Sequence, residues 1–452
     1  MADNMADKLV PIAQMPLRAR HWYIFAVASL EQLIGAALST IAGIIIPLIL
    51  LLGTPHLSAA EQGILGAAGL VGIAVGSVII GKLMDSMGYL VWFRLCPLII
   101  AAGAGGVYFS DSFWPLAASL FVIGLGVGGG YSLDSGYISE VMPAKWESFF
   151  VGLAKATCSV GFVGGAAYAY FLLKADPTAA AWPYLILFVG GLGVLGFLLR
   201  LRWYQSPRWL MARGETEKAQ AAARDFLGPD AEVLPLPKQD AGKPVSWGAM
   251  FRGENLDKVI FSGISWACEG LGVYGFGVFL PILVMALGLQ GGADEGLPKV
   301  LDSVRTTIFI NIFIGAGFAI GLAVLHKVNS VRLMGWSFVL CALSLAVLWA
   351  GHAWSWPVWV SFLAFVVFET ALNAGPHLVT FIIPSKIYPV AERGAGMGIA
   401  AMLGKVGAML GVFFMPVLLS LGGITAVLLV SIAVQLLGAA VTFIYGKRLK
   451  LV

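Results

Sequence analysis

Ionisable side chains inside long apolar segments are the residues of this sequence that could do chemistry. A charged group in the hydrocarbon core of a membrane is energetically costly, so each such residue is a functional candidate. Four acids and one lysine lie well inside apolar runs: Glu31, Asp134, Glu269, Glu369 and Lys405. A buried acid could carry a proton, and the lysine could attract a carboxylate or a phosphate. The pattern favours a site that handles protons together with a small solute.

Each of these residues also has a plainer interpretation. Glu31 carries a transported proton, or it is the fixed partner of Lys405. Lys405 attracts a substrate anion, or it forms a standing ion pair with Glu369 or Glu31. Asp134 couples a proton, or it belongs to an inner gate. Lys155 is nearer the end of its apolar run, where a lysine is expected to extend to the inner surface.

Polar and aromatic neighbours extend two of the acidic positions into clusters. Gln32 follows Glu31 directly, and it could bind substrate or form a hydrogen bond between helices. Glu269 lies close in sequence to Trp266 and Tyr274. An acid between two aromatic residues suits a small polar solute, although the aromatic rings could equally serve packing.

A third cluster follows a helical repeat. Glu369, Asn373 and His377 recur every fourth residue, so they share one helix face. We predict that this stripe relays a proton or contacts the ligand, although a buried histidine is commonly only hydrogen-bonded. His377 also aligns with Tyr131 across an internal repeat.

The composition indicates that most of the chain lies in a lipid bilayer. Of 452 residues, 59% are hydrophobic and 12% are charged, whereas soluble proteins have about 25% charged residues. The four cysteines lack metal-site spacing, and no phosphate-binding loop or nucleophile motif occurs. The sequence predicts no metal, no cofactor and no enzyme activity, and the net charge of +4 reflects membrane loops rather than nucleic-acid binding. The first apolar run is about thirty residues long, too long for a cleavable signal peptide.

Apolar length predicts twelve membrane-spanning helices, because a helix needs about 20 apolar residues to cross the hydrocarbon core. The expected spans are residues 22–52, 63–82, 91–109, 113–141, 149–173, 182–200, 259–287, 306–326, 332–351, 357–384, 395–420 and 423–445.

Lysine and arginine set the expected orientation. Cytoplasmic loops carry an excess of these residues. With the N-terminus inside, the inner loops and the C-terminal tail hold ten of them, namely Lys82, Arg94, Lys145, Lys327, Arg332, Lys386, Arg393, Lys447, Arg448 and Lys450. The outer loops hold Lys174, Lys299 and Arg305. We therefore expect both termini in the cytoplasm and a location in the inner (plasma) membrane.

A polar stretch at 203–258 separates two similar halves, 1–202 and 259–452. Within it, 215–227 has the pattern of a short amphipathic helix. Prolines and glycines recur at matching positions of the two halves. Pro47 matches Pro281, Gly152 matches Gly398, Gly161 matches Gly407, and the segment 139–143 matches 385–389. Two six-helix halves that rock about a central site form a transporter architecture. Since one chain holds both halves, we expect a monomer.

Three motifs resemble those of the major facilitator superfamily. Residues 81–88 (GKLMDSMG) are similar to its GxLxDxxG loop, residues 204–210 (YQSPRWL) to the PESPRWL motif of sugar porters, and residues 384–394 to their PxExFPTxxRG exit. The resemblance covers nearly the whole chain. It implies an all-α fold of twelve helices in which the first, fourth, seventh and tenth line a central cavity. It also implies gating roles for Asp85, Arg94, Glu140, Arg208 and Arg393.

The branch within the superfamily is marked by further similarities and departures. Residues 373–382 resemble the NxGPNxTTFI stretch of phosphate:proton symporters, and 128–131 resemble their GGDY, with Gly130 in place of the acid. The fourth span also resembles niacin-type and synaptic-vesicle-glycoprotein-like members. The QQxSG signature of sugar porters is absent from the seventh span, and Gln205 replaces the glutamate of PESPRWL. These departures favour an organic-solute porter over a phosphate or hexose porter.

The leading hypothesis is a proton-coupled symporter for a small organic anion. It rests on Lys405, placed among protonatable acids near the middle of the bilayer. The acids outnumber this lysine, so a cationic, zwitterionic or sugar-like solute and proton-driven export stay open. A transporter-like receptor without flux is a remote alternative.

Overall fold

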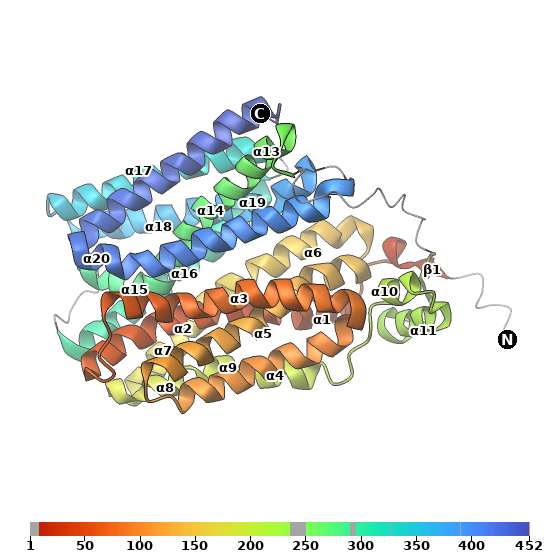
Figure 1. Cartoon of the computed structure of the whole chain (residues 1–452), viewed down its shortest axis with the longest axis horizontal. Coiled ribbons are helices and arrows are strands. Elements are labelled where there is room, and N and C mark those ends of the chain that lie inside the picture. Colours follow the sequence, from red (N-terminus) through yellow and green to blue (C-terminus); the bar gives the residue numbers. More distant parts are fainter. Residues whose placement is uncertain (1–8, 236–249, 290–294, 326, 389, 452) are drawn as a thin grey trace.

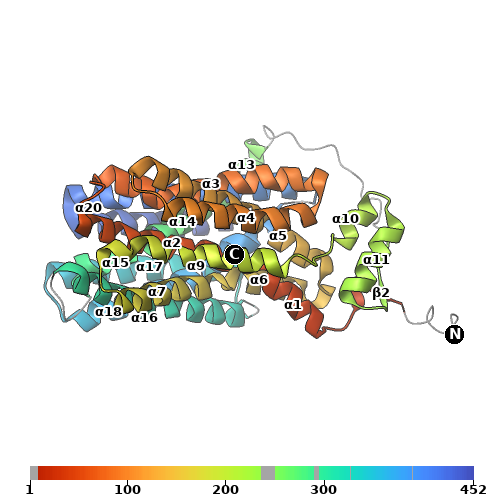
Figure 2. The same ribbon diagram turned by 90° about the horizontal axis from the view of Figure 1, so that it is seen from below.

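The chain folds as a bundle of long helices in two halves that lie side by side (Figures 1 and 2). The structure is a computed structural model that describes residues 9–235, 250–289, 295–325, 327–388 and 390–451, without the side chains of 85, 86, 135, 148, 385 and 390–395. Within these residues, eleven helical segments are long and apolar enough to cross a membrane. The last of them joins two helices at Gly422 and Gly423, so the bundle has twelve crossings.

Six crossings precede the polar linker. They are formed, in order, by α1 (Ala19–Ala28) with α2 (Leu30–Leu52), α3 (Ala59–Met87), α4 (Tyr89–Tyr108), α5 (Phe113–Val141), α6 (Ala144–Ala156) with α7 (Cys158–Ala175), and η3 (Ala179–Ala181) with α8 (Trp182–Leu185) and α9 (Leu187–Leu199).

Six crossings follow the linker. The seventh combines α13 (Gly253–Val259), the π-helical turn η4 (Ile260–Ile264), α14 (Ser265–Gly270), the π-helical turn η5 (Leu271–Gly275) and α15 (Phe276–Ala286). The others are α16 (Gly296–Val324), α17 (Ser330–Ala353), α18 (Val358–Ala374) with α19 (Pro376–Ile387), and the two parts of α20 (Val390–Arg448).

Local signals fix several helix ends. Ser58 and Glu61 form a capping box at the start of α3, in which each side chain accepts a hydrogen bond from the other's backbone amide. The Asn329 carboxamide accepts hydrogen bonds from two amides at the start of α17. Gly53, with a φ of 68°, ends α2 in the left-handed conformation that glycine adopts without strain.

The internal repeat recurs as two equivalent helix contacts. Gly161 of α7 packs against the backbone carbonyl of Leu33 in α2. Gly407 of α20 packs in the same way against the carbonyl of Ala267 in α14. The register that aligns Pro47 with Pro281 also aligns Leu33 with Ala267. A Cβ atom at either glycine would collide with the carbonyl, so both halves depend on glycine at the same position.

The two halves share one core at the end of the bundle remote from the linker. Gly43 of α2 packs against the Val278 carbonyl of α15, and Gly63 of α3 against the Phe413 carbonyl of α20. The surrounding core includes side chains of both halves, among them Ile41, Leu65, Phe279 and Met415. At the linker end, the described residues form separate cores, one in the first half and others in the second. The halves thus share their main core at one end of the molecule, and a smaller shared cluster with Phe162 and Phe318 joins α7 to α16.

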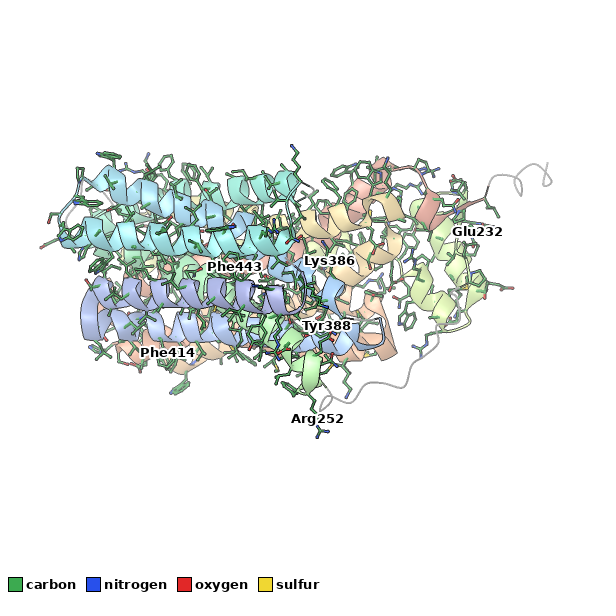
Figure 3. All side chains as sticks on the ribbon, turned by 90° about the horizontal axis from the view of Figure 1, so that it is seen from above. Glu232, Arg252, Lys386, Tyr388, Phe414 and Phe443 are labelled. Atoms are coloured by element: carbon green, nitrogen blue, oxygen red, sulfur yellow. The ribbon has the colours of Figure 1, made fainter. Side chains whose placement is uncertain are left out.

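The linker end carries a small module outside the bundle. It consists of η2 (Ile12–Gln14), α10 (Pro207–Ala212), α11 (Thr216–Leu227) and a two-stranded parallel sheet of β1 (Val10–Pro11) and β2 (Ala231–Glu232). Arg18 donates two hydrogen bonds to the Asp230 carboxylate, at 2.7 and 2.5 Å. Figure 3 shows Glu232 in this module, Arg252 and Lys386 near the same end of the second half, and Phe414 toward the opposite end.

Most of the predicted elements are present, with shifted ends. The twelve expected spans all correspond to helices, and the predicted amphipathic helix is α11. The eighth span begins at Gly296 rather than at 306, because its first turns are polar and helical, with an ion pair between Asp302 and Arg305 at 3.2 Å. Lys299 and Arg305 therefore lie in a helix rather than in the loop that the sequence predicts. The domain limits at 202 and 258 stay a prediction.

Candidate functional site

Breaks in two helices of the first half meet near the centre of the bundle. The first crossing is interrupted at Ser29, between α1 and α2, and the fifth at Thr157, between α6 and α7. The Thr157 hydroxyl donates to the Ala154 carbonyl at 2.6 Å and lies 3.4 Å from the Ser29 carbonyl. Glu31 and Lys155 each lie two residues from a break. Interrupted helices mark binding sites in many transporters.

The second half has matching irregularities. Two π-helical turns flank α14, which carries Glu269, and the second turn carries Tyr274. Such turns are frequent at functional sites. The tenth crossing is interrupted at Gly375, two residues before His377. These irregularities place Glu269, Tyr274 and His377 at the interior of the bundle, where all three are buried.

Two lysines from opposite halves converge on one tyrosine. The Lys405 Nζ atom lies 5.4 Å from the ring centre of Tyr131 and 5.0 Å from that of Tyr274. The Lys155 Nζ atom lies 5.9 Å from the ring centre of Tyr131. These distances are in the range of cation–π attraction. The expectation that Lys155 extends to the inner surface is wrong, because its ammonium group lies over the Tyr131 ring instead.

A chain of four polar side chains lies beside these lysines. The His377 Nε2 atom is 3.6 Å from the Glu269 Oε1 atom. On its other side, His377 Nδ1 is 2.7 Å from the Asn373 Oδ1 atom. The Asn373 amide nitrogen donates to the backbone carbonyl of Glu369 at 2.8 Å and to its carboxylate at 3.3 Å. The predicted stripe on one helix face is therefore hydrogen-bonded from Glu369 to His377, and Glu269 lies just beyond hydrogen-bond distance of its far nitrogen.

The orientation of Asn373 decides where the proton of neutral His377 lies. Since the Asn373 nitrogen donates to Glu369, its oxygen faces His377 and accepts from Nδ1–H. The Nε2 atom of a neutral His377 is then a bare acceptor that faces Glu269. One proton between Nε2 and the Glu269 carboxyl would satisfy both groups.

The internal repeat relates this pair to a contact in the first half. The alignment that matches Pro47 with Pro281 also matches Gly35 with Glu269. The alignment that matches Gly161 with Gly407 also matches Tyr131 with His377. A Cβ atom at Gly35 would collide with the Tyr131 hydroxyl. Equivalent positions therefore touch in both halves, as an ionisable pair in one and as a neutral packing contact in the other.

Two further predicted site residues lie on neighbouring helices. Trp266 is half-buried, with its ring packed over Gly404 and at 6.1 Å from the ring of Phe381 in a T-shaped arrangement. Gln32 is buried and approaches Asp134 of α5, without the geometry of a full hydrogen bond. Substrate roles for both residues stay predictions.

Glu31 is held by a residue that the sequence analysis missed. Arg200, which follows α9, binds both Glu31 carboxylate oxygens, the second at 2.6 Å. Its guanidinium also donates to the carbonyls of Val27 and Phe93, at 2.6 and 3.3 Å. The alternative that Glu31 pairs with Lys405 is wrong. Lys405 likewise makes no ion pair with Glu369 among the described residues, because its ammonium group lies over the two tyrosine rings.

Asp134 lies near this ion pair. It is buried, and neither carboxylate oxygen has a hydrogen-bond partner among the described residues. Glu31 and Arg200 are its charged neighbours. The proton-coupling roles predicted for Glu31, Asp134 and Glu369 stay predictions.

Three of the five predicted gating residues have described side chains, and these lie at the linker end of the molecule. Arg94 donates to the carbonyls of Arg200 and Leu201, at 3.2 and 2.7 Å. Glu140 accepts hydrogen bonds from the hydroxyls of Tyr89 and Ser206. Arg208 lines a shallow surface pocket against the N-terminal strand. The predictions for Asp85 and Arg393 fall on side chains outside those that the structure describes.

Gln205 has a structural role at the same end. Its side-chain oxygen accepts hydrogen bonds from the amides of Tyr89 and Leu90, at 2.9 and 3.3 Å. Both amides belong to the first turn of α4, where the helix itself supplies no acceptor, so Gln205 acts as a cap supplied by another segment. A neutral amide therefore serves the position where sugar porters have glutamate.

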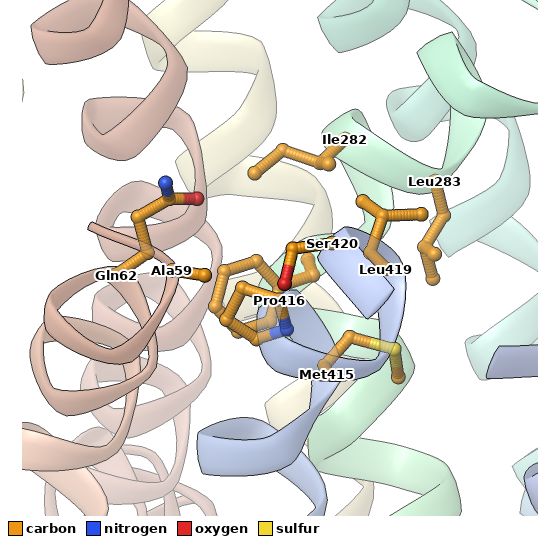
Figure 4. Close-up of a pocket in the computed structure, with 9 residues that line it drawn as sticks. Ala59, Gln62, Ile282, Leu283, Met415, Pro416, Leu419 and Ser420 are labelled. Carbon is orange, nitrogen blue, oxygen red and sulfur yellow. The ribbon is translucent and has the colours of Figure 1, made fainter. Parts of the chain in front are cut away.

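A pocket of about 160 Å³ lies between the halves at the end remote from the linker, where they share a core (Figure 4). Its lining is mostly apolar, with Gln62 and Ser420 as its polar members. None of the ionisable candidates lines it. No cluster of three metal-ligating side chains occurs in the described part of the chain.

Residues 27–450 match the family described as "Sugar (and other) transporter". The chain belongs to this family. The transporter is 24% identical over 388 residues to the inner membrane metabolite transport protein YgcS of Escherichia coli (strain K12), covering 86% of this chain and 83% of the relative. It is 25% identical over 377 residues to the putative inorganic phosphate transporter 1-13 of Oryza sativa subsp. japonica, covering 76% and 73%.

Solved structures show the same fold. The xylose transporter XylE of Escherichia coli, in a partially occluded inward-open conformation, superposes with a TM-score of 0.77 at 16% identity, covering 94% of this transporter and 97% of XylE. The predicted major facilitator fold is confirmed, and the transporter is a multi-pass membrane protein of the sugar-porter type. The relatives and structural neighbours are transporters, so the prediction that the chain is not an enzyme is also confirmed.

Proposed function

We propose that this transporter moves a small organic anion together with a proton by alternating access. The observation that carries the proposal is the convergence of Lys155 and Lys405, from opposite halves, on the ring of Tyr131. The charges of both lysines act on Glu269 and His377. A carboxylate or phosphate group between the lysines would contact both halves at once, as an alternating-access site requires.

The distribution of acids supports an anionic solute. Glu31 is paired with Arg200, and Glu369 is bonded to Asn373. Glu269 is therefore the acid that faces the two lysines. Two positive charges opposite one carboxylate attract an anion, and a site with little water strengthens that attraction. Asp134 is the further acid whose charge acts on Tyr131, and it lies on the side of the Glu31–Arg200 pair.

The packing of the halves supports access from the linker end. The halves share a core at the far end, where close glycine contacts hold the helices together and the pocket between the halves has a mostly apolar lining. The lysine and arginine distribution favours the cytoplasm as the side of the linker and both termini. We therefore propose that the site faces the cytoplasm in this conformation, and that one chain suffices for transport.

A sugar-like solute is the second candidate. The family includes sugar transporters by its description, and the site offers Trp266, Tyr274 and Asn373. Aromatic rings and carboxamides are common contacts of neutral polar ligands. The two lysines have no evident partner in such a ligand, so this candidate is the weaker one.

A binding screen on purified protein tests the proposal. Lactate, succinate, benzoate, inorganic phosphate, xylose and choline are each added, and the melting temperature is measured. A bound ligand raises it by mass action. We expect an anion to stabilise the wild type but neither Lys405→Ala nor Lys155→Ala. Stabilisation by xylose or choline alone, unchanged in both variants, would contradict the proposal.

Lys174→Ala is the matched control. Its ammonium group lies 5.9 Å from the ring centre of Tyr170, the same distance as between Lys155 and Tyr131, but Lys174 is exposed at the end of α7. The Lys174→Ala variant removes one positive charge and one lysine–tyrosine contact, as the central variants do, but far from the central site. An equal loss of anion binding in this control would contradict a site-specific role for the two central lysines.

A further inference from the structure

We propose that Glu269 is the internal counter-ion of Lys155 and Lys405, and that the transported anion takes its place while a proton moves onto the Glu269–His377 pair. The proposal rests on the proposed function and assigns the coupling proton to a residue outside the three acids that the sequence favoured for that role. It follows from the position of Glu269, the contact with His377, and the count of charges at the centre.

Glu269 is the negatively charged group that a solute anion would have to replace beside the two lysines. It is buried on α14, and the groups that face it come from several helices: Lys155 of α6, Cys158 of α7, His377 of α19 and Lys405 of α20. Without a solute, an ionised Glu269 offsets one of the two lysine charges. A solute carboxylate between the lysines would add a second negative charge beside it.

Protonation of Glu269 removes that conflict. A neutral Glu269 carboxyl can donate to the bare Nε2 atom of His377 once Oε1 moves from its present 3.6 Å to hydrogen-bond distance. The lysines are then left for the solute anion. Binding of the proton raises the affinity for the anion, and binding of the anion raises the affinity for the proton. Symport requires this coupling. Loss of the proton restores the ionised Glu269, which competes with the anion for the lysines and favours its release.

His377 is suited to support this exchange without carrying the charge itself. Asn373 fixes its Nδ1–H, so Nε2 is presented to Glu269 as an acceptor. Both lysines oppose a positive charge on the imidazole, because their charges act on His377 as well. The proton is therefore expected on the carboxyl, hydrogen-bonded to His377.

The decisive variant is Glu269→Gln, which imitates the protonated carboxyl. We expect it to bind the stabilising anion of the screen more tightly than the wild type at alkaline pH, by about tenfold, and with little dependence on pH. A residue that only supports the structure would not increase affinity when replaced. Equal or weaker binding, with the pH dependence of the wild type, would overturn the proposal. Glu217→Gln, an exposed change on α11, is the matched control and should bind like the wild type.

A second measurement needs no solute. Infrared titration of the ligand-free protein follows the C=O stretching band of protonated carboxyl groups as the pH is lowered. We expect one component of this band to be missing in Glu269→Gln and present in Glu217→Gln. A full band in Glu269→Gln would overturn the proton site. A missing component together with no binding of lactate, succinate, benzoate or phosphate would instead overturn the proposed anion transport.

Discussion

The Arg200 guanidinium binds the Glu31 carboxylate through both terminal nitrogens, and neither side chain reaches solvent. Arg200 follows α9, and Glu31 lies in the first turn of α2, so the pair ties the sixth crossing to the first. The same guanidinium lies 4.8 Å above the ring of Phe93. This cluster holds the break in the first crossing in place.

Removing one member of this pair should destabilise the protein strongly. Arg200→Leu leaves Glu31 as a buried charge without its partner, and breaking a buried ion pair in this way typically costs about 3–5 kcal/mol. We expect a lower melting temperature and poor recovery from the membrane. The measurement is thermal unfolding of purified protein in detergent.

The double variant separates charge from packing. Glu31→Gln together with Arg200→Leu removes the unpaired Glu31 carboxylate, so we expect it to recover much of the stability lost in Arg200→Leu. A double variant as unstable as the single one would show that the arginine acts through its bonds to the Val27 and Phe93 carbonyls instead.

The repeated glycine contacts give a second prediction. Gly161→Leu and Gly407→Leu each place a side chain against a backbone carbonyl of the neighbouring helix. We expect each to destabilise its half by about 1–3 kcal/mol or more, because the helices must separate. Gly191→Leu, where a Cβ atom meets nothing within 4 Å, should leave the melting temperature nearly unchanged. Similar melting temperatures for all three variants would argue against this packing.

The ion pair between Arg18 and Asp230 gives a prediction about pH. The hydrogen bond from Arg18 lowers the pKa of the Asp230 carboxyl. Its stabilising contribution is thus complete above the unfolded value of about 4 and is lost as the pH falls through the lower folded value. At neutral pH we expect Asp230→Asn to speed exchange of the Val10 amide, which is bonded to the Asp230 carbonyl, by about two- to fivefold.

Hydrogen-exchange mass spectrometry checks this prediction. Glu215→Gln removes the exposed Glu215–Lys218 pair on α11 and serves as the control, with no change expected at Val10. Exchange at Val10 that is the same in Asp230→Asn and the wild type would show that the strand pairing alone holds the N-terminal segment.

The sequence was sufficient for the fold because apolar length and the internal repeat are properties of the chain itself. The twelve crossings and the amphipathic helix α11 follow from composition and periodicity. The stripe of Glu369, Asn373 and His377 was also predictable, since residues four apart on a helix lie on one face. The contact of His377 with Glu269 was not, because it joins helices whose relative rotation depends on packing.

One basic residue was misjudged and another was overlooked for one physical reason. Arg200 and Lys155 lie near the ends of apolar runs, where such residues are expected to extend toward water. Arg200 instead folds back onto Glu31, and the Lys155 ammonium group lies over the Tyr131 ring. The direction in which a long side chain extends has no strong signal in a single sequence. The depth of Lys155 could therefore not be counted from its position alone.

The most direct test of the anion site is uptake into proteoliposomes of the anion that stabilises the purified protein, with the outside more acidic. Wild-type protein should accumulate it, and accumulation should collapse when a protonophore removes the gradient. Lys405→Ala and Lys155→Ala should each reduce uptake by about 10- to 100-fold, the effect of losing one charge-assisted hydrogen bond, while Lys174→Ala should not. Uptake by both central variants at the wild-type rate would contradict the account and would mean that the two lysines have only a structural role.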